Sequence, residues 1–307
     1  MKVKSCLPRI LPASVFICFL LYAATPTMAK NDVYVVSTAS EFLSALGSYR
    51  TVRLADHTHL NLSEVLESES KCTAIGMLMI GEGADLSERV GAFSEERFDG
   101  RQLHLHKINN LTIVGGKDCS IIIDPHYSNV IEMSECNNIT LKNLTMGHSE
   151  EGYCEGGVIY AVSSNNIEVE DCELYGCGTY GIQATECSVV SVKNTVIRDC
   201  SYGIMEFYSC SQVRFDSCDF FRCREFSLIT FVDCSLAALN DCRICANQGP
   251  LFYVKSPLYM GHCAVYHELS EVGSLNQVDD ENTTWDANHT SLEPRSIGPD
   301  GGVSVKW

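Results

Sequence analysis

The sequence predicts an all-β protein, a right-handed, single-stranded parallel β-helix with three strands per rung and a small N-terminal α/β cap. The first observation is a pattern that recurs between about residues 103 and 254. Its equivalent apolar positions are spaced 28, 28, 23, 23 and 24 residues apart, at Leu111, Ile139, Ile167, Val190, Val213 and Ala237. A fixed period of roughly 20 to 50 residues is typical of a solenoid.

The second observation is that each repeat consists of short alternating segments. Apolar residues occupy every second position, as at Ile159 and Ala161 and again at Ile167 and Val169. Alternation with period two predicts strands that bury one face. Residues that tolerate a tight bend follow at a constant offset, at Asn143, Asp171, Asn194, Ser217 and Asp241. Strands in one order and direction make a parallel β-helix, and chain chirality favours the right-handed coil.

Cysteines are the third observation, because they follow the repeat. The chain has 17 cysteines, and most occupy columns in which Cys alternates with Ser, Thr, Leu or Asn, as Cys136 does with Ser164 and Cys172 with Thr195. Such columns require a small side chain, which buried free Cys provides. We expect inward thiol stacks, although bridges between successive rungs are sterically possible.

The array is flanked by segments of other kinds. Residues 1–29 are predicted to be a signal peptide, because Lys2, Lys4 and Arg9 precede an apolar run and Ala29 supplies a small residue for cleavage. Residues 30–100 are predicted to form the cap, with strands at 33–37, 51–54 and 77–80 and a helix capped by Ser40. The β-helix is expected over 101–268, and residues 269–307 are expected to form a C-terminal tail or cap, since solenoid ends need cover.

Location and charge limit the possible partners. We expect a secreted or cell-envelope protein, in the periplasm or at the cell surface, with no retained membrane span. The formal net charge is −17, and loss of the signal would leave 19 basic against 39 acidic residues. This charge excludes nucleic acid as an expected partner and weighs against a simple binder of acidic polysaccharide.

Three segments carry a family resemblance: Asn110-Leu111-Thr112-Ile113, Asn138-Ile139-Thr140-Leu141, and the run from Leu174 to Ile182. Over about residues 100–265 the chain resembles right-handed parallel β-helix proteins of the pectate-lyase-like superfamily, including uncharacterised exported bacterial members. The resemblance implies the fold and a polysaccharide partner. It carries over no catalytic residue, because the local motifs of polygalacturonases and the calcium and arginine set of pectate lyases are not found.

Candidate functional residues lie at outward positions of the strand that precedes each equivalent position. One column holds His104, Glu132, Tyr160, Gln183, Glu206 and Thr230, and a second holds His106, Ser134, Val162, Thr185, Tyr208 and Val232. Aromatic faces and planar polar groups are what a sugar-binding groove uses. We therefore predict Tyr160, Gln183, Tyr208 and His104 as substrate-binding residues; a solvated sheet face is the alternative.

Catalytic candidates come from the same face and from the loop over residues 147–157, whose insertion lengthens the period to 28. Glu132 and Glu206 are three rungs apart, about 14 Å, which is too far for a hydrolytic carboxylate pair. A pair would have to use the loop, which offers His148, Glu150, Glu151 and Glu155. Arg198 precedes the strand of Glu206 and Tyr208 and is predicted to neutralise a uronate in a lyase.

The sequence thus predicts an exported β-helix that binds or cleaves a polysaccharide along one strand face, as a lyase or a glycoside hydrolase. The predicted catalytic residues are Glu132, His148, Glu155, Glu206 and Arg198. No cofactor is required by this scheme, Ca²⁺ is compatible with the loop carboxylates, and no metal site is assigned. The alternative is a non-catalytic surface, adhesion or structural protein. The sequence leaves the oligomeric state open.

Overall fold

The computed structural model describes residues 32–68, 90–150, 155–176, 178–268, 271–273, 275–287, 296–297 and 303–304. The predicted signal peptide, the strand predicted at 77–80 and loop residues 151–154 lie outside these ranges. Within them, no helix is both long enough and apolar enough to cross a bilayer.

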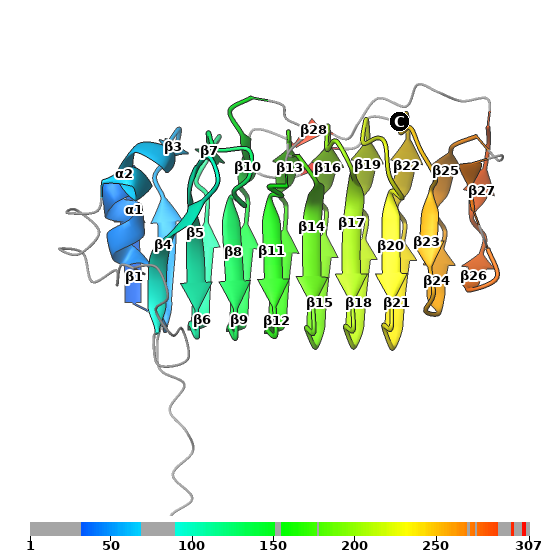
Figure 1. Ribbon diagram of the computed structural model, residues 1–307, viewed down its shortest axis with the longest axis horizontal. Coiled ribbons are helices and arrows are strands. Elements are labelled where there is room, and N and C mark those ends of the chain that lie inside the picture. The colour runs from blue at the N-terminus through cyan, green and yellow to red at the C-terminus, as the bar shows by residue number, and fades with distance from the viewer. Residues whose placement is uncertain are drawn as a thin grey trace, which may run out of the picture. The chain divides into compact units, whose positions relative to one another are not determined.

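Three long sheets run along the described chain, and each rung of the coil contributes one strand to each of them (Figure 1). Sheet A contains β1 (Asp32–Val36), β2 (Arg50–Leu54), β6 (Asn109–Val114), β9 (Asn137–Lys142), β12 (Asn165–Glu170), β15 (Val189–Lys193), β18 (Gln212–Asp216), β21 (Leu236–Asn240), β24 (Leu258–Gly261) and β26 (Val278–Glu281). Sheet B contains β3 (His59–Asn61), β7 (Ser120–Ile123), β10 (Thr145–His148), β13 (Glu173–Tyr175), β16 (Val196–Arg198), β19 (Asp219–Phe221), β22 (Arg243–Cys245), β25 (Ala264–Tyr266) and β27 (Thr284–Trp285). Sheet C contains β4 (Gly91–Arg97), β5 (Gly100–His106), β8 (Ile131–Ser134), β11 (Ile159–Val162), β14 (Tyr180–Thr185), β17 (Gly203–Tyr208), β20 (Ile229–Val232) and β23 (Phe252–Val254).

The predicted repeat register is confirmed at every step. Leu111, Ile139, Ile167, Val190, Val213 and Ala237 are successive cross-strand partners in sheet A. All six are at most 2% exposed and belong to one continuous hydrophobic core. The prediction of a parallel β-helix with three strands per rung is therefore confirmed.

The corners between strands have a common local structure. The predicted bend residues Asn143, Asp171, Asn194, Ser217 and Asp241 have φ between 46° and 55°, the left-handed region that Asn and Asp tolerate best. At four of these five corners the next residue carries a thiol or a hydroxyl that donates to the carbonyl two residues earlier, whereas the aliphatic Leu144 follows Asn143. The Thr195 hydroxyl donates to Lys193 at 2.8 Å, and the Cys172 thiol donates to Glu170 at 3.2 Å. All twelve cysteines of the described residues are buried and none of them forms a disulfide, which confirms the inward thiol stacks there.

Both flanks differ from the prediction in extent. β1, β2 and β3 already belong to sheets A and B, and β26 and β27 extend the same sheets beyond residue 268, the predicted end of the β-helix. Helix α1 (Ala39–Ala45) is capped by Thr38 and not by Ser40, because Thr38 and Glu41 form a capping box. The other described elements are α2 (Ser63–Glu67) and the antiparallel pair β28 (Ser296–Ile297) and β29 (Val303–Ser304).

Candidate functional site

The outward face of sheet C carries the predicted row of polar side chains. His104, Glu132, Tyr160, Gln183, Glu206 and Thr230 are successive cross-strand partners from β5 to β20. The row is thus confirmed as a structural feature, with neighbours one strand spacing apart, about 4.8 Å. Its two parts, at β5–β8 and at β14–β17, differ in construction.

At the first end of the face, β4 and β5 form an antiparallel hairpin around Phe98 and Asp99. The hairpin places Glu95 opposite Gln102 and Phe93 opposite His104. Its side chains meet those of β8 and of the segment before it in an array that we call the edge cluster. The edge cluster consists of Glu95, Arg97, Gln102, His104, His106, Asn129, Glu132 and Ser134.

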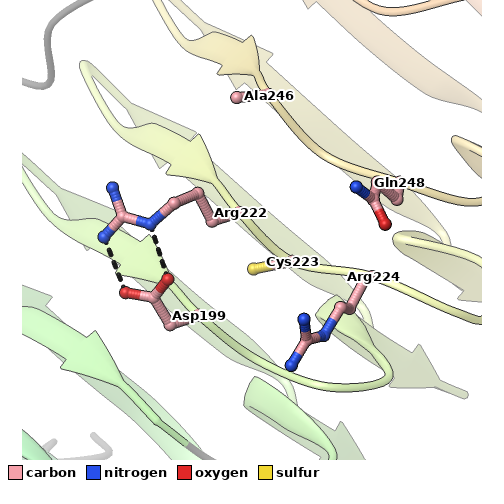
Figure 2. A pocket seen from close by; sticks show the side chains of 6 residues that line it. All are labelled: Asp199, Arg222, Cys223, Arg224, Ala246 and Gln248. Atoms are coloured by element: carbon pink, nitrogen blue, oxygen red, sulfur yellow. Dashed lines mark hydrogen bonds and ion pairs between the residues drawn. The ribbon is translucent and has the colours of Figure 1, made fainter.

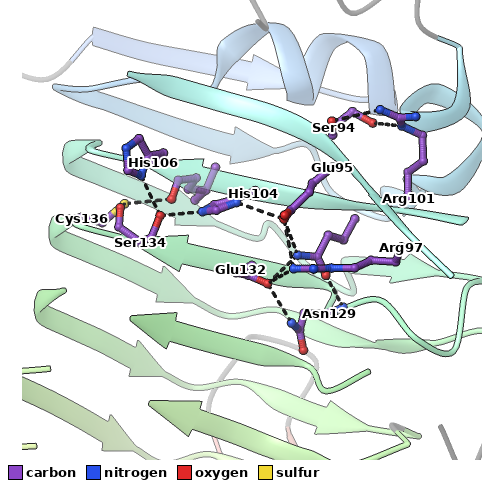
Figure 3. Close-up of polar contacts among 12 residues, drawn as sticks. Ser94, Glu95, Arg97, Arg101, His104, His106, Asn129, Glu132, Ser134 and Cys136 are labelled. Carbon is purple, nitrogen blue, oxygen red and sulfur yellow. Dashed lines mark hydrogen bonds and ion pairs between the residues drawn. The ribbon is translucent and has the colours of Figure 1, made fainter. Parts of the chain in front are cut away.

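Two carboxylates of the edge cluster share their hydrogen-bond donors (Figure 3). Arg97 Nη2 lies 3.1 Å from Glu95 Oε2 and 2.8 Å from Glu132 Oε2. Gln102 Nε2 donates to the same two oxygens, at 2.9 and 2.5 Å, and Asn129 Nδ2 donates to Glu132 Oε2 at 3.1 Å. The Glu132 side chain is only 10% exposed. Oε2 of Glu132 therefore accepts from three N–H donors, which anchors this carboxylate.

Glu95 is ionised at neutral pH. Burial opposes its ionisation, but the hydrogen bond from His104 and the nearby positive charge of Arg97 hold the pKa of Glu95 below its usual value. A general acid in a glycosidase needs a raised carboxyl pKa instead. Glu95 and Glu132 are close together, but this electrostatic environment does not suit a hydrolytic acid–base pair.

A metal ion at the edge cluster would compete with Arg97 for the two carboxylates. Glu95, His104 and Glu132 each offer a ligand atom, and these atoms lie within 4.8 Å of one another. However, Arg97 already bonds to both carboxylates and supplies the positive charge that a metal ion would bring. The geometry permits three ligands, but the donor set is that of an ion-paired network.

Two imidazoles of the edge cluster converge on Ser134. His104 Nε2 lies 2.6 Å from Ser134 Oγ, and His106 Nδ1 lies 2.7 Å from the same oxygen. His104 Nδ1 faces Glu95 Oε2 at 3.1 Å. Both imidazoles are buried, whereas Ser134 is half-buried. His104 thus lies beneath the surface, so the structure does not present it as the sugar-contacting residue that the sequence predicted.

The second part of the face is more open. Gln183 Nε2 donates to Glu206 Oε2 at 3.0 Å, and the Tyr208 hydroxyl donates to Glu206 Oε1 at 3.3 Å. Tyr208 is 37% exposed, and Tyr160 is half-buried. Burial and the neighbouring Glu206 raise the pKa of Tyr208, so its hydroxyl remains a donor at neutral pH. Four of the predicted residues therefore lie together on one accessible strip.

His148 and Arg198 are not on this face. His148 ends β10 in sheet B, pairs with the buried Ile123 and donates from Nε2 to the Ser128 carbonyl at 2.9 Å. It was predicted as a loop residue, but the strand extends to it, and burial lowers the pKa of His148.

Arg198 ends β16, also in sheet B. It bonds to Glu173 at 2.5 Å and Asp199 at 2.6 Å and stacks on Tyr175. The predicted grouping of Arg198 with Glu206 and Tyr208 is therefore not formed, because the corner between the strands directs Arg198 to another sheet.

Glu155 lies at the end of the inserted loop and is exposed. Its carbonyl accepts from Thr179 Oγ1 at 3.4 Å. Two residues later, Gly157 N–H donates to Asn129 Oδ1 at 2.9 Å. The loop end is thereby tied to the edge cluster through Asn129, with the Glu155 side chain on the surface.

A separate cleft of about 190 Å³ lies at a sheet B corner (Figure 2). It is lined by Asp199, Arg222, Cys223, Arg224, Ala246 and Gln248. Arg222 bonds to both oxygens of Asp199, at 2.6 and 2.7 Å. This ion pair neutralises one wall of the cleft.

Sequence reasoning missed Glu95, Arg97, Gln102 and Asn129. The signal for the first three was present: Phe93, Glu95 and Arg97 alternate before Asp99-Gly100, a dipeptide that favours hairpin turns. The signal was hard to use, because β4 lies outside the repeat and pairs antiparallel. Asn129 gave no local signal; its position depends on the course of the loop.

Comparisons with known proteins agree with this architecture. Residues 129–272 match the family model described as "Right handed beta helix region". The pectate lyase PelN from Paenibacillus sp. 0602 superposes with a TM-score of 0.56 at 9% identity, covering 87% of this chain and 80% of that one. A Bacillus sp. N165 pectate lyase in complex with trigalacturonate superposes with a TM-score of 0.54 at 11% identity, covering 84% and 83%. No curated protein matches the chain in sequence. The chain has the right-handed parallel β-helix fold of these pectate lyases.

Proposed function

We propose that this protein binds a polysaccharide along the outward face of sheet C, across β11, β14 and β17. The observation that carries the proposal is the strip formed by Tyr160, Gln183, Glu206 and Tyr208. Tyrosine rings offer flat apolar surfaces to sugar rings, and the linked amide and carboxylate offer fixed acceptors and donors to hydroxyl groups. An array that repeats at strand spacing suits a ligand that is itself a repeating chain.

The charge of the protein selects among polysaccharides. The chain has a net charge of −17, and the strip itself contains Glu206 with no described basic partner at hydrogen-bond distance. A polyuronate would be repelled by such a surface. We therefore propose a neutral glycan as the ligand, unlike the trigalacturonate in the Bacillus enzyme complex.

Within this proposal, Glu132 fixes the end of the strip, because its inner oxygen already accepts three hydrogen bonds. Glycan binding of this kind requires no metal, and export places the face outside the cytoplasm. The rival function is a rigid surface or adhesion protein without glycan affinity.

Binding should be measured by calorimetry on a panel of soluble neutral glycans and polyuronates. Tyr208→Ala should weaken binding to the preferred glycan by about five-fold, or about 1 kcal/mol. The matched control is Tyr259→Ala, because Tyr259 is a sheet A tyrosine whose hydroxyl bonds to Glu281, as that of Tyr208 bonds to Glu206. Equal effects of the two substitutions, or no binding to any glycan, would refute the proposal. Reducing ends and unsaturated products measured on the same panel would show whether bound glycan is also cleaved.

A further inference from the structure

Ser134 is held between two imidazoles, and one of these is held by a carboxylate. The chain of contacts runs from Glu95 Oε2 to His104 Nδ1 at 3.1 Å, and from His104 Nε2 to Ser134 Oγ at 2.6 Å. His106 Nδ1 approaches the same Oγ from another side at 2.7 Å. Figure 3 shows the three links in sequence across β4, β5 and β8.

The hydrogen positions in this chain follow from Glu95. An ionised carboxylate can only accept, so His104 Nδ1 carries the proton and Nε2 presents its lone pair. The Ser134 hydroxyl then donates to His104 Nε2. Its oxygen is left to accept from His106 Nδ1–H. In this arrangement Glu95, His104 and Ser134 each have a partner, and the Ser134 proton points toward His104 Nε2.

We infer that Ser134, His104 and Glu95 form a nucleophile, a general base and a positioning carboxylate that hydrolyse O-acyl esters. The order of roles is that of a serine hydrolase, which is recognised by geometry and not by chain order. The inference goes beyond polysaccharide binding, because it applies to any small ester that reaches Ser134. Acyl substituents on sugar hydroxyls are the ester class that a glycan-binding face would present.

The reaction balances with water as the only co-reactant. Ser134 Oγ attacks the acyl carbon while its proton passes to His104 Nε2, and the carbonyl electron pair moves to oxygen. The tetrahedral adduct collapses, the C–O bond to the alcohol breaks, and His104 returns its proton to the leaving oxygen. Water then attacks the acyl-Ser134 in the same way, His104 again relays the proton, and a carboxylic acid leaves. As the adduct forms, the His106 N–H, which starts 2.7 Å from Ser134 Oγ, would turn to the carbonyl oxygen and stabilise the negative charge that develops there.

The two imidazoles are buried, whereas the hydroxyl of Ser134 is accessible. Phe93 is fully buried and packs edge-on against His104, with ring centroids 6.5 Å apart. His104 is 3% exposed and His106 2%, so water is excluded from the imidazoles. Ser134 is half-buried and remains accessible. A buried base beneath an accessible hydroxyl is the arrangement that nucleophilic catalysis requires.

The register of sheet C provides a matched control. Thr185 occupies the same outward column as Ser134, two strands along, through Val162. It is half-buried like Ser134 and also carries a hydroxyl. The strand beside Thr185 carries Tyr160 and Val162 at the positions that correspond to His104 and His106, and neither is an imidazole. Thr185→Ala therefore removes a hydroxyl from the face without removing the triad.

A fluorophosphonate probe, which reacts with activated serine hydroxyls, should test the inference on the full-length folded protein. Peptide mass spectrometry should locate the label on Ser134, Ser134→Ala should abolish it, and Thr185→Ala should leave its rate unchanged. His104→Gln, which can still hydrogen-bond to Ser134, should slow labelling by about a hundred-fold or more. Acetylation of Ser134 by 4-nitrophenyl acetate should show the same pattern.

The pH profile distinguishes Glu95 as a positioning residue from a merely structural one. The charged or titratable groups around the imidazoles lie on three strands and the adjoining turns: Glu95 and Arg97 on β4, His104 and His106 on β5, Glu132 on β8, and the Lys107–Glu135 pair. Glu95→Gln removes the negative charge that faces His104 Nδ1 at 3.1 Å, so the rise of labelling with pH should move to lower pH. A purely structural role would lower the rate without moving the midpoint.

Absence of label on Ser134 in the folded wild-type protein would overturn the inference. Labelling of His104→Gln at the wild-type rate would do the same. Because the probes are small and contain no sugar, these results are independent of polysaccharide binding. Loss of glycan affinity in Tyr208→Ala with Ser134 labelling intact would separate the two proposals.

Discussion

The outward face of sheet C is built in two ways, by regular rungs and by a hairpin. In the rungs from β11 to β20, each strand adds one side chain to each column, and contacts run along the column, as from Gln183 to Glu206. At the β4–β5 hairpin the chain reverses, and Glu95 and Arg97 come to lie against Glu132 of the next strand. Repetition spreads polar groups into a strip suited to binding. The departure from repetition concentrates them into a network suited to chemistry.

The largest loss of stability in the regular rungs is expected from a substitution at an inward position. Ile167→Asp places a carboxylate between Ile139 and Val190 in an aliphatic column, and we expect a loss of about 4 kcal/mol or more in the free energy of unfolding. Glu168→Asp, one residue further on the outward side, should change it by less than about 0.5 kcal/mol. Urea denaturation of both variants measures the difference. A stable Ile167→Asp protein would contradict the register of the columns.

The stability of the β4–β5 hairpin should depend on the Arg97 guanidinium, which bonds to both carboxylates. Arg97→Ala leaves Glu95 and Glu132 together without the guanidinium that bonds to both, and we expect a cost of about 2 kcal/mol at neutral pH. The control is Arg214→Ala, because Arg214 is 62% exposed and pairs with Asp216 within one strand; its cost should stay below about 1 kcal/mol. If both substitutions cost the same, the edge cluster is no more cooperative than a surface ion pair.

Glu95 should contribute to the pH dependence of protein stability. Its folded-state pKa is lowered, so its contribution is present above its unfolded pKa, about 4.3, and is lost as the pH falls through the lower folded value. Glu95→Gln should therefore be less stable than wild type at pH 7, and the difference should shrink on acidification. The effect should be smaller than that of Arg97→Ala, because only one of the two carboxylates is removed. Thermal melts from pH 7 to pH 3 would test this, and a constant difference would contradict it.

The contrast between rungs and hairpin also explains what could be predicted from the sequence. Ile167 and Tyr208 could be placed, because each repeat gives an independent reading of the same inward or outward position. Glu95 could not, because β4 occurs once, and its partner is set by the hairpin turn. Arg198 and His148 were misplaced for a related reason. Both end sheet B strands, and the alternation of apolar residues does not predict the direction of the chain beyond the end of a strand.

The smallest effect is expected at the thiol columns of the regular rungs. Burial raises the pKa of Cys172 to about 12, so the thiol stays protonated and donates to the Glu170 carbonyl at 3.2 Å. Thr195, its neighbour in the column, makes the equivalent bond through its hydroxyl. Cys172→Ser should therefore cost less than about 1 kcal/mol, because the new hydroxyl finds the same acceptor.

Leu174→Ser is the matched control, two residues along at the next inward position of sheet B. There the hydroxyl replaces an aliphatic side chain, and we expect a cost of about 3 kcal/mol from the lost packing. Urea denaturation of the two serine variants should separate them clearly. If Cys172→Ser were as costly as Leu174→Ser, position 172 would require a sulfur atom. The hydrogen bond to the Glu170 carbonyl would then not explain which residues this column accepts.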